Sequence, residues 1–152
     1  MQCHKCLAHP CQKGNPCETK ESLPLYENDL DRRLVAVSSE IEALFYGEAC
    51  RVDETLEFAR RMRFKKLGLA FCVGFSEEAT LLASIIEKEF ELCSVCCKVG
   101  SLPKESVGAK LKPWVGTISC NPAEQARVLN ESGSELNIVL GLCVGHDAVF
   151  YR

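Results

Sequence analysis

The chain contains the segment Lys65-Lys66-Leu67-Gly68-Leu69-Ala70-Phe71-Cys72-Val73-Gly74-Phe75-Ser76, in which an apolar run leads into a cysteine, a glycine and a serine. The run from Leu67 to Phe71 has the length of a buried strand. Ser76 can cap a helix that continues to about residue 90 with its apolar residues on one face. The segment therefore predicts a strand followed by a helix, which is the repeating unit of α/β proteins.

The same alternation extends on both sides of this segment. Further strands are expected at residues 91–96, 115–119 and 136–142, and helices at 29–47, 52–63 and 121–130. Asn121 suits a helix N-cap, Pro122 suits the first helical position, and Gly133 suits the helix end. The alternation predicts an α/β, Rossmann-like three-layer fold with a mostly parallel sheet of about four strands, although no Gly-x-Gly-x-x-Gly fingerprint is present.

Composition and charge limit the class of partner. The chain has 152 residues, of which 47% are hydrophobic, so it can bury a core without disulfides. With a net charge of −3 and no apolar run of membrane-spanning length, we expect neither nucleic acid nor a membrane as partner. The N-terminal residues lack the apolar core of a signal peptide, so we expect a cytoplasmic protein.

Cysteine is the unusual component, with 11 residues in the chain. An odd number of cysteines in a reducing cytosol argues against a disulfide scaffold. It favours metal ligands, redox thiols or small buried side chains. Cys50 and Cys93 lie in no cysteine motif, and we expect them to be packing residues.

Residues 1–28 are predicted to form a Cys-rich metal-binding cap ahead of an α/β domain at residues 29–152. The cap contains the cysteines Cys3, Cys6, Cys11 and Cys17. It has almost no apolar periodicity, so a bound metal would have to supply the free energy that orders it. Four thiolates suit tetrahedral Zn²⁺. The spacing differs from a standard zinc ribbon, so His4 or His9 can replace one ligand, and an iron–sulfur cluster is the alternative cofactor.

A second group of cysteines follows the predicted strands, and its members are Cys72, Cys96, Cys97, Cys120 and Cys143. The carboxyl ends of parallel strands meet at one sheet edge, where ligand sites form. The turns after Cys72 and Cys143 contain Gly74 and Gly145, which allow a tight turn or the close approach of a cofactor. His146 adds a metal ligand or a base. We expect Cys72, either Cys96 or Cys97, Cys120 and Cys143 to form a second site for a metal or iron–sulfur cluster here, and the alternative is a set of core cysteines.

The combined motifs resemble a prokaryotic family of uncharacterised metal-binding proteins, the domain of unknown function 1847. The residues that carry the resemblance are the Cys-rich opening, Phe71-Cys72-Val73-Gly74, Ser94-Val95-Cys96-Cys97-Lys98-Val99-Gly100, Cys120-Asn121-Pro122 and Gly141-Leu142-Cys143-Val144-Gly145-His146-Asp147. The resemblance covers nearly the whole chain and implies metal binding, with no reaction to transfer. It also implies at least one more strand after the last motif, so we expect a truncated or a short family member.

Three classes of function fit these patterns. In the favoured class, zinc occupies the cap and a second metal or iron–sulfur cluster serves electron transfer or sensing with a redox or protein partner that the sequence does not identify. The first alternative is a thiol-dependent enzyme that uses Cys143 with His146 as base. The second alternative is a protein that stores or delivers metal ions.

Overall fold

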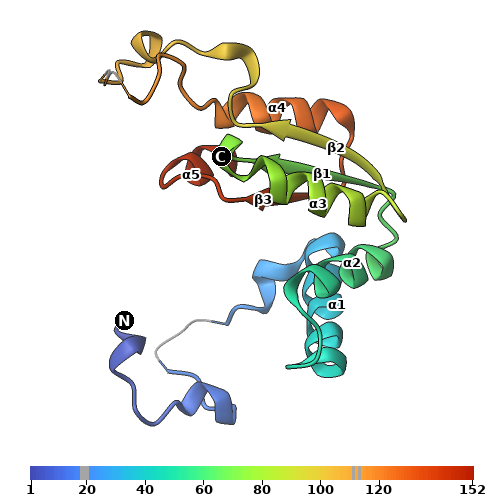
Figure 1. Cartoon of the computed structure of the whole chain (residues 1–152). Helices are drawn as coiled ribbons and strands as arrows, with labels where there is room; N and C mark the ends of the chain where they lie inside the picture. Colours follow the sequence, from blue (N-terminus) through green and yellow to red (C-terminus); the bar gives the residue numbers. More distant parts are fainter. Residues whose placement is uncertain (18–20, 111, 113) are drawn as a thin grey trace. The chain divides into compact units, whose positions relative to one another are not determined.

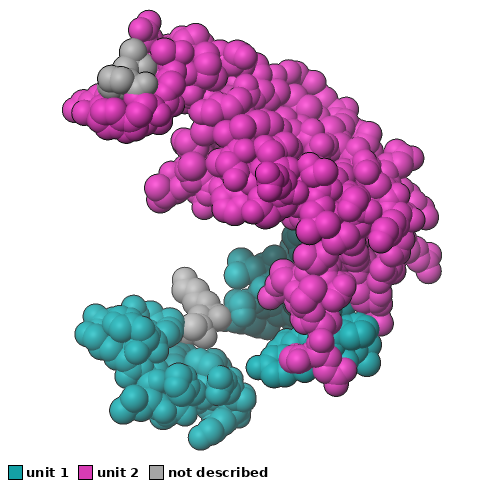
Figure 2. Space-filling view, viewed as in Figure 1, with its two compact units in different colours: residues 1–46 teal, residues 47–152 magenta. Residues whose placement is uncertain are grey.

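The computed structural model describes residues 1–17, 21–110, 112 and 114–152 (Figure 1). The chain divides into two units, Met1–Tyr46 and Gly47–Arg152 (Figure 2). Residues 18–20 of the predicted cap lie outside the described residues, as do residues 111 and 113 of a long loop.

The first unit consists of short turns and one long helix. Three 3-10 turns, Cys3–Lys5, Pro10–Lys13 and Leu23–Tyr26, precede helix α1, Asp29–Phe45. The side-chain oxygen of Asn28 caps α1 by accepting a hydrogen bond from the Leu30 amide at 2.8 Å. None of the described residues before α1 is buried. The segment that carries the first cysteine group therefore has no apolar core of its own.

A parallel sheet forms the centre of the second unit. Strand β1, Lys66–Phe71, pairs on one side with β2, Glu91–Cys96, and on the other with β3, Leu136–Leu140. This confirms the predicted α/β class and the parallel sheet. The order is β2-β1-β3, and the sheet has three strands within the part of the chain that the structure describes.

The strand predicted at residues 115–119 is wrong. Its backbone pairs with a neighbouring loop, because the Lys104 amide donates to Thr117 at 2.9 Å and the Ser119 amide donates to Leu102 at 2.7 Å. Gly116 has a φ of 73°, which interrupts an extended backbone. Pro103 and Ile118 form only an isolated antiparallel bridge. Residues 115–119 therefore have a strand-like sequence but pair with no strand of the sheet.

Helices cover both faces of the sheet (Figure 1). Helix α2, Arg51–Met62, and helix α3, Ser76–Ile86, contribute to the core cluster on one face, which includes Leu56, Leu67 and Ile86. Helix α4, Pro122–Ser132, and the short helix α5, His146–Phe150, contribute to the cluster on the other face, which includes Ala70, Leu129 and Phe150. Since successive strand residues face opposite sides, Leu67 and Ala70 of β1 enter different clusters.

The helix boundaries show where local sequence signals hold. The Asn121 side chain accepts from the Glu124 amide at 3.3 Å and Gly133 ends α4 with a φ of 76°, so both predicted caps are confirmed. The prediction for α3 is wrong at both ends. Ser76 is its first residue, with its hydroxyl donating to the Val73 carbonyl at 2.7 Å, and the helix stops at Ile86 because the following residues turn and return Phe90 to the core.

Candidate functional site

The register of the sheet sets the position of the second cysteine group. Phe71, the last residue of β1, lies opposite Cys96 of β2. One step further, the Cys97 amide donates to the Phe71 carbonyl at 2.8 Å, and the Cys72 amide donates to the Leu140 carbonyl at 3.0 Å. Cys72 and Cys97 therefore leave adjacent strands at the same level of the carboxyl edge.

The two neighbouring cysteines, Cys96 and Cys97, have different surroundings. Val95 belongs to the core cluster beneath α4, and Cys97 follows it by two residues on the same side of the backbone. Cys97 is only 1% exposed, whereas Cys96 is half-buried and lies on the opposite side of the strand. The sequence left open which of the two joins the other thiols, and the structure brings Cys97 to Cys120.

Cys97 and Cys120 form a close thiol pair, with their Sγ atoms 3.6 Å apart. The Asn121 amide donates to the Cys97 carbonyl at 2.8 Å, which ties the two chain segments together. The Val73 amide donates to the Cys97 sulfur at 3.3 Å. The Lys98 ammonium lies 3.6 Å from the Cys120 sulfur and donates to the Ile118 carbonyl at 2.9 Å. The pair therefore has a fixed backbone and a cation beside one of its sulfurs.

Cys72 and Cys143 lie within electrostatic reach of this pair. Burial raises the pKa of the Cys97 thiol to about 12, and the neighbouring Cys120 and Cys72 also raise it. Burial likewise raises the pKa of Cys143, and the charges of Cys72 and Cys120 raise it further. Lys98 opposes that shift. Four cysteines thus converge on the carboxyl edge of the sheet, and we call them the edge thiols.

The turns that contain the predicted cofactor-binding glycines differ. Gly145 has a φ of 80° immediately before α5, a conformation that favours glycine. Gly74 lies in a 3-10 turn, Val73–Phe75, and is not among the glycines with positive φ. The half-buried His146 begins α5, and its amide donates to the Cys143 carbonyl at 2.9 Å. Sequence similarity between the two turns therefore does not extend to their backbone conformation.

Gln125 is a residue beneath the edge thiols that the sequence did not indicate. It is fully buried in α4, and its side-chain amide donates to the Val95 carbonyl at 2.8 Å and to the Phe71 carbonyl at 3.2 Å. Its Oε1 has no hydrogen-bond partner among the described residues. Gln125 holds α4 against the strand ends from which Cys72 and Cys97 emerge.

The cysteines of the N-terminal segment also lie together, and we call Cys3, Cys6, Cys11 and Cys17 the cap thiols. All four line one cavity of about 300 Å³, together with His9. The sulfurs of Cys11 and Cys17 are 3.7 Å apart. Cys11 is the main cause of the raised pKa of Cys17, and the charges of Cys6 and Cys3 add to it. His4 is not among the cavity residues.

The sulfur separations can be compared with zinc geometry. Zinc–sulfur bonds of about 2.3 Å in a tetrahedron place neighbouring sulfurs roughly 3.8 Å apart. The pairs Cys11–Cys17 at 3.7 Å and Cys97–Cys120 at 3.6 Å match that spacing. In the residues for which the structure gives positions, no three histidine, cysteine or acidic side chains converge on one metal position. Each cluster therefore presents one pair at ligand spacing with further thiols close by.

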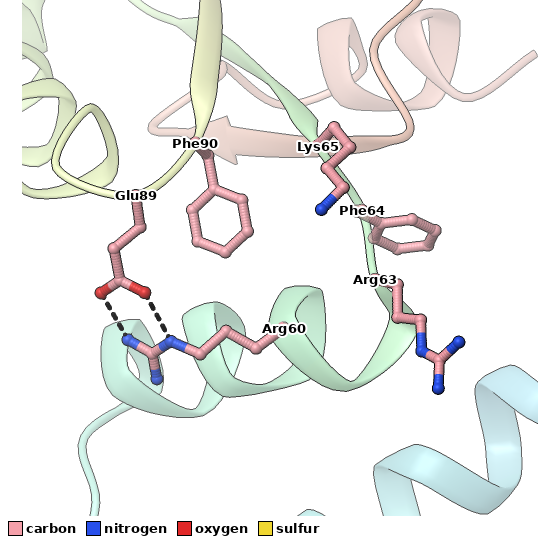
Figure 3. A pocket seen from close by; sticks show the side chains of 6 residues that line it. All are labelled: Arg60, Arg63, Phe64, Lys65, Glu89 and Phe90. Atoms are coloured by element: carbon pink, nitrogen blue, oxygen red, sulfur yellow. Dashed lines mark hydrogen bonds and ion pairs between the residues drawn. The ribbon is translucent and has the colours of Figure 1, made fainter.

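A separate pocket lies at the amino end of β1 and β2, away from the edge thiols (Figure 3). It has a volume of about 370 Å³, and its lining residues are Arg60, Arg63, Phe64, Lys65, Glu89 and Phe90. Arg60 forms two hydrogen bonds to the Glu89 carboxylate, at 2.6 and 2.7 Å. Glu89 therefore offsets one of the three cations that line the pocket.

These features define an α/β protein with a parallel sheet, edge thiols and a Cys-rich N-terminal segment. Among the described residues, the longest helix does not have the length and apolarity needed to cross a membrane. The chain belongs to the family described as protein of unknown function DUF1847, whose sequence profile matches residues 10–152. This confirms the resemblance. The chain is similar to the uncharacterised protein MJ0455 of Methanocaldococcus jannaschii, with 39% identity over 156 residues that cover 100% of this chain and 81% of that protein. No solved structure matches this chain.

Proposed function

We propose that this protein binds metal through its cap thiols and that one zinc ion is held there by Cys3, Cys6, Cys11 and Cys17. The observation that carries the proposal is that all four line a single cavity, with Cys11 and Cys17 already at zinc-ligand spacing. His9 is the residue that can replace one thiolate, since it lines the same cavity. Zinc would supply four bonds that order the segment.

The electrostatics of the cap thiols support a cation. The hydrogen bond between the thiols of Cys11 and Cys17 raises the pKa of Cys17, whereas hydrogen bonds from the Cys17 backbone and thiol lower that of Cys11. The charges of Cys11, Cys6 and Cys3 raise the pKa of Cys17 further, because like charges repel its thiolate. A divalent cation removes that repulsion and favours the thiolate form. The described residues before α1 bury no side chain, so the metal would replace the missing apolar core.

The edge thiols are the second part of the proposal. Cys72, Cys97, Cys120 and Cys143 would hold a second metal or an iron–sulfur cluster for electron transfer or sensing, at the carboxyl edge of a Rossmann-like unit. The Cys97–Cys120 separation of 3.6 Å supports this, as does the Val73 amide that donates to the Cys97 sulfur. Amide hydrogen bonds to ligand sulfurs tune the potentials of such clusters.

The structure also bears on the two alternatives. Burial and the neighbouring Cys72 and Cys120 raise the pKa of Cys143, which is opposite to the lowered pKa of an activated nucleophile and does not favour a thiol enzyme with Cys143 as nucleophile and His146 as base. A metal store or delivery protein is supported by the exposure of Cys3, Cys11 and Cys17, because exposed ligands exchange their metal readily. Rapid transfer of zinc to a chelator would distinguish that role from a structural site.

The test is metal analysis of the full chain purified without oxygen. Zinc, iron and acid-labile sulfide are counted per chain in the unsubstituted protein and in the variants Cys6→Ser and Cys97→Ser. We expect Cys6→Ser to lose about one zinc, the stoichiometry of a four-thiolate site, and Cys97→Ser to lose only the metal of the edge thiols. Cys50→Ser is the matched control, since Cys50 is exposed, lies in neither cysteine cluster and donates its thiol hydrogen to the Asp53 carboxylate at 3.1 Å. An unsubstituted chain without bound metal would reject the proposal.

A further inference from the structure

The edge thiols contain an asymmetric pair that can exchange with a disulfide. Cys97 is 1% exposed, whereas its partner Cys120 is half-buried. An external molecule can therefore reach the sulfur of Cys120 before that of Cys97. Their sulfurs are already in contact at 3.6 Å, so a bond of about 2.05 Å requires only a side-chain adjustment.

The surroundings of the pair keep the two sulfurs together. The backbone hydrogen bond from Asn121 to Cys97 fixes the two chain segments at 2.8 Å. The Lys98 ammonium lies 3.6 Å from the Cys120 sulfur and donates to the Ile118 carbonyl at 2.9 Å, which holds the two residues beside each other. Because the two sulfurs are held together, Cys97 should attack a mixed disulfide on Cys120 faster than a second external thiol would.

We propose that Cys97 and Cys120 form a reversible dithiol–disulfide pair that exchanges with small or protein-borne disulfides, Cys120 reacting first and Cys97 closing the bridge. This activity goes beyond the metal-binding proposal. The exchange takes place only when no metal is bound to the edge thiols. The closed disulfide would in turn prevent metal from binding there.

The exchange proceeds in two balanced steps. In the first, the Cys120 sulfur bonds to one sulfur of the external disulfide, whose sulfur–sulfur bond breaks. The leaving sulfur takes the Cys120 proton and departs as a thiol. In the second, the Cys97 sulfur bonds to the Cys120 sulfur, the mixed disulfide breaks, and a second thiol leaves with the Cys97 proton. The protein loses two electrons and two protons, and the external disulfide gains both.

The neighbouring Cys96 provides a matched control. It is one residue from Cys97 but lies on the opposite side of β2, so it should not form the bridge. Both cysteines fall in the tryptic peptide of residues 89–98, and Cys120 falls in the peptide of residues 111–127. Cross-linking of these two peptides reports the bridge, and serine variants identify which cysteine forms it.

The experiment treats the full chain, reduced and stripped of metal with a chelator, with bis(2-hydroxyethyl) disulfide and maps its tryptic peptides by mass spectrometry. We expect the two peptides to be linked in the unsubstituted chain and in Cys96→Ser, and the link to be lost in Cys97→Ser and in Cys120→Ser. The Cys120→Ser chain should also lack a mixed disulfide on Cys97, which fragment ions distinguish from Cys93 and Cys96 in the same peptide. Persistence of the link in Cys97→Ser, or no link in the unsubstituted chain, would overturn the inference. Metal content is measured on separate, untreated protein, so failure of metal binding and failure of exchange are distinguished.

Discussion

The cap thiols and the edge thiols contain the same number of cysteines in opposite surroundings. The cap thiols lie in a segment of short turns, and none of its described residues is buried. The edge thiols are anchored by a hydrogen-bonded sheet, with Cys97 almost completely buried against it. In both clusters one sulfur pair has the spacing of ligands on a shared metal.

The difference shows that a thiol cluster can arise in two ways. At the edge, the backbone register and the core under α4 bring the sulfurs together, so the arrangement does not need a metal. In the cap, none of the residues that the structure describes is buried, so a bound cation would supply most of the ordering free energy. Removal of metal should therefore change the cap strongly and the sheet edge weakly.

The largest expected effect comes from breaking the cap thiols. In Cys6→Ser we expect loss of about one zinc per chain and rapid proteolysis within the described residues 1–17, because a metal site contributes its binding free energy to folding. The α/β unit at residues 47–152 should stay resistant, since its sheet and helices do not include the cap cysteines. Metal analysis and timed trypsin digestion measure both effects.

Cys50→Ser controls for the loss of one thiol, because Cys50 lies in neither cluster. It should retain full metal content and the digestion pattern of the unsubstituted chain. The proposed difference between the two clusters is wrong if the N-terminal segment of Cys6→Ser stays resistant to trypsin. It is also wrong if trypsin digests the α/β unit of Cys6→Ser as fast as the N-terminal segment.

The sequence predicted the features that depend on local pattern. The length of the apolar run at residues 67–71 predicted strand β1, and Asn121 and Pro122 predicted the start of α4. The alternation of strands and helices predicted that the sheet is parallel. The meeting of cysteines at one edge followed from the parallel sheet. The sequence did not predict whether Cys96 or Cys97 joins the other thiols, because this depends on which side of β2 faces α4.

Features that depend on distant partners were missed or wrong. Residues 115–119 had the pattern of a strand, but the Thr117 carbonyl and the Ser119 amide form hydrogen bonds with Lys104 and Leu102 of a loop. Gln125 resembled a solvent-facing helix residue, yet it is buried because two strand carbonyls accept its amide hydrogens. Neither fact can be obtained from a window of neighbouring residues.

The second prediction concerns the reactivity of Cys97. Burial raises its pKa from an ordinary 9.0 to about 12, so its thiolate should be roughly a thousandfold scarcer at pH 8 than that of an ordinary cysteine. In metal-free protein, iodoacetamide should label the exposed Cys11 and Cys50 long before Cys97. Mass spectrometry of timed samples measures this order. Fast labelling of Cys97 would contradict its burial at the sheet edge.

The same shift predicts a loss of stability at alkaline pH. The folded pKa of Cys97 lies above its unfolded value, so the unfolded chain releases this proton first. The contribution of the protonated Cys97 thiol to the free energy of unfolding is complete below about pH 9 and decreases as the pH rises toward about 12. Urea titrations of Cys97→Ala should show a weaker pH dependence in that range than the unsubstituted chain.

The fourth prediction tests the packing that supports the sheet edge. A Cβ at Gly141 would collide with the ring of Phe75, and the φ of 63° also disfavours other residues. Gly141→Ala should therefore lower the free energy of unfolding by about 2–4 kcal/mol. Gly133→Ala is the matched control, because Gly133 has a φ of 76° but no atom near its Cβ position. It should lose only about 1–2 kcal/mol, and equal losses in urea would show that the Phe75 contact is unimportant.

The smallest expected effect lies at the amino end of the sheet, where Arg60 and Glu89 form an exposed ion pair. Arg60 lowers the pKa of the Glu89 carboxyl below its usual 4.5, so the pair stabilises the fold above that pH and ceases to do so as Glu89 is protonated. Solvent screens exposed pairs, so Glu89→Gln should shift the urea midpoint only slightly at pH 7 and not at all near pH 2. Because the pocket that contains this ion pair shares no residue with the cap thiols and lies at the opposite end of the strands from the edge thiols, the variant should retain its metal content and the Cys97–Cys120 exchange. A change in either property would show that the edge thiols depend on charges at the far end of the sheet, and not on their local hydrogen bonds and burial alone.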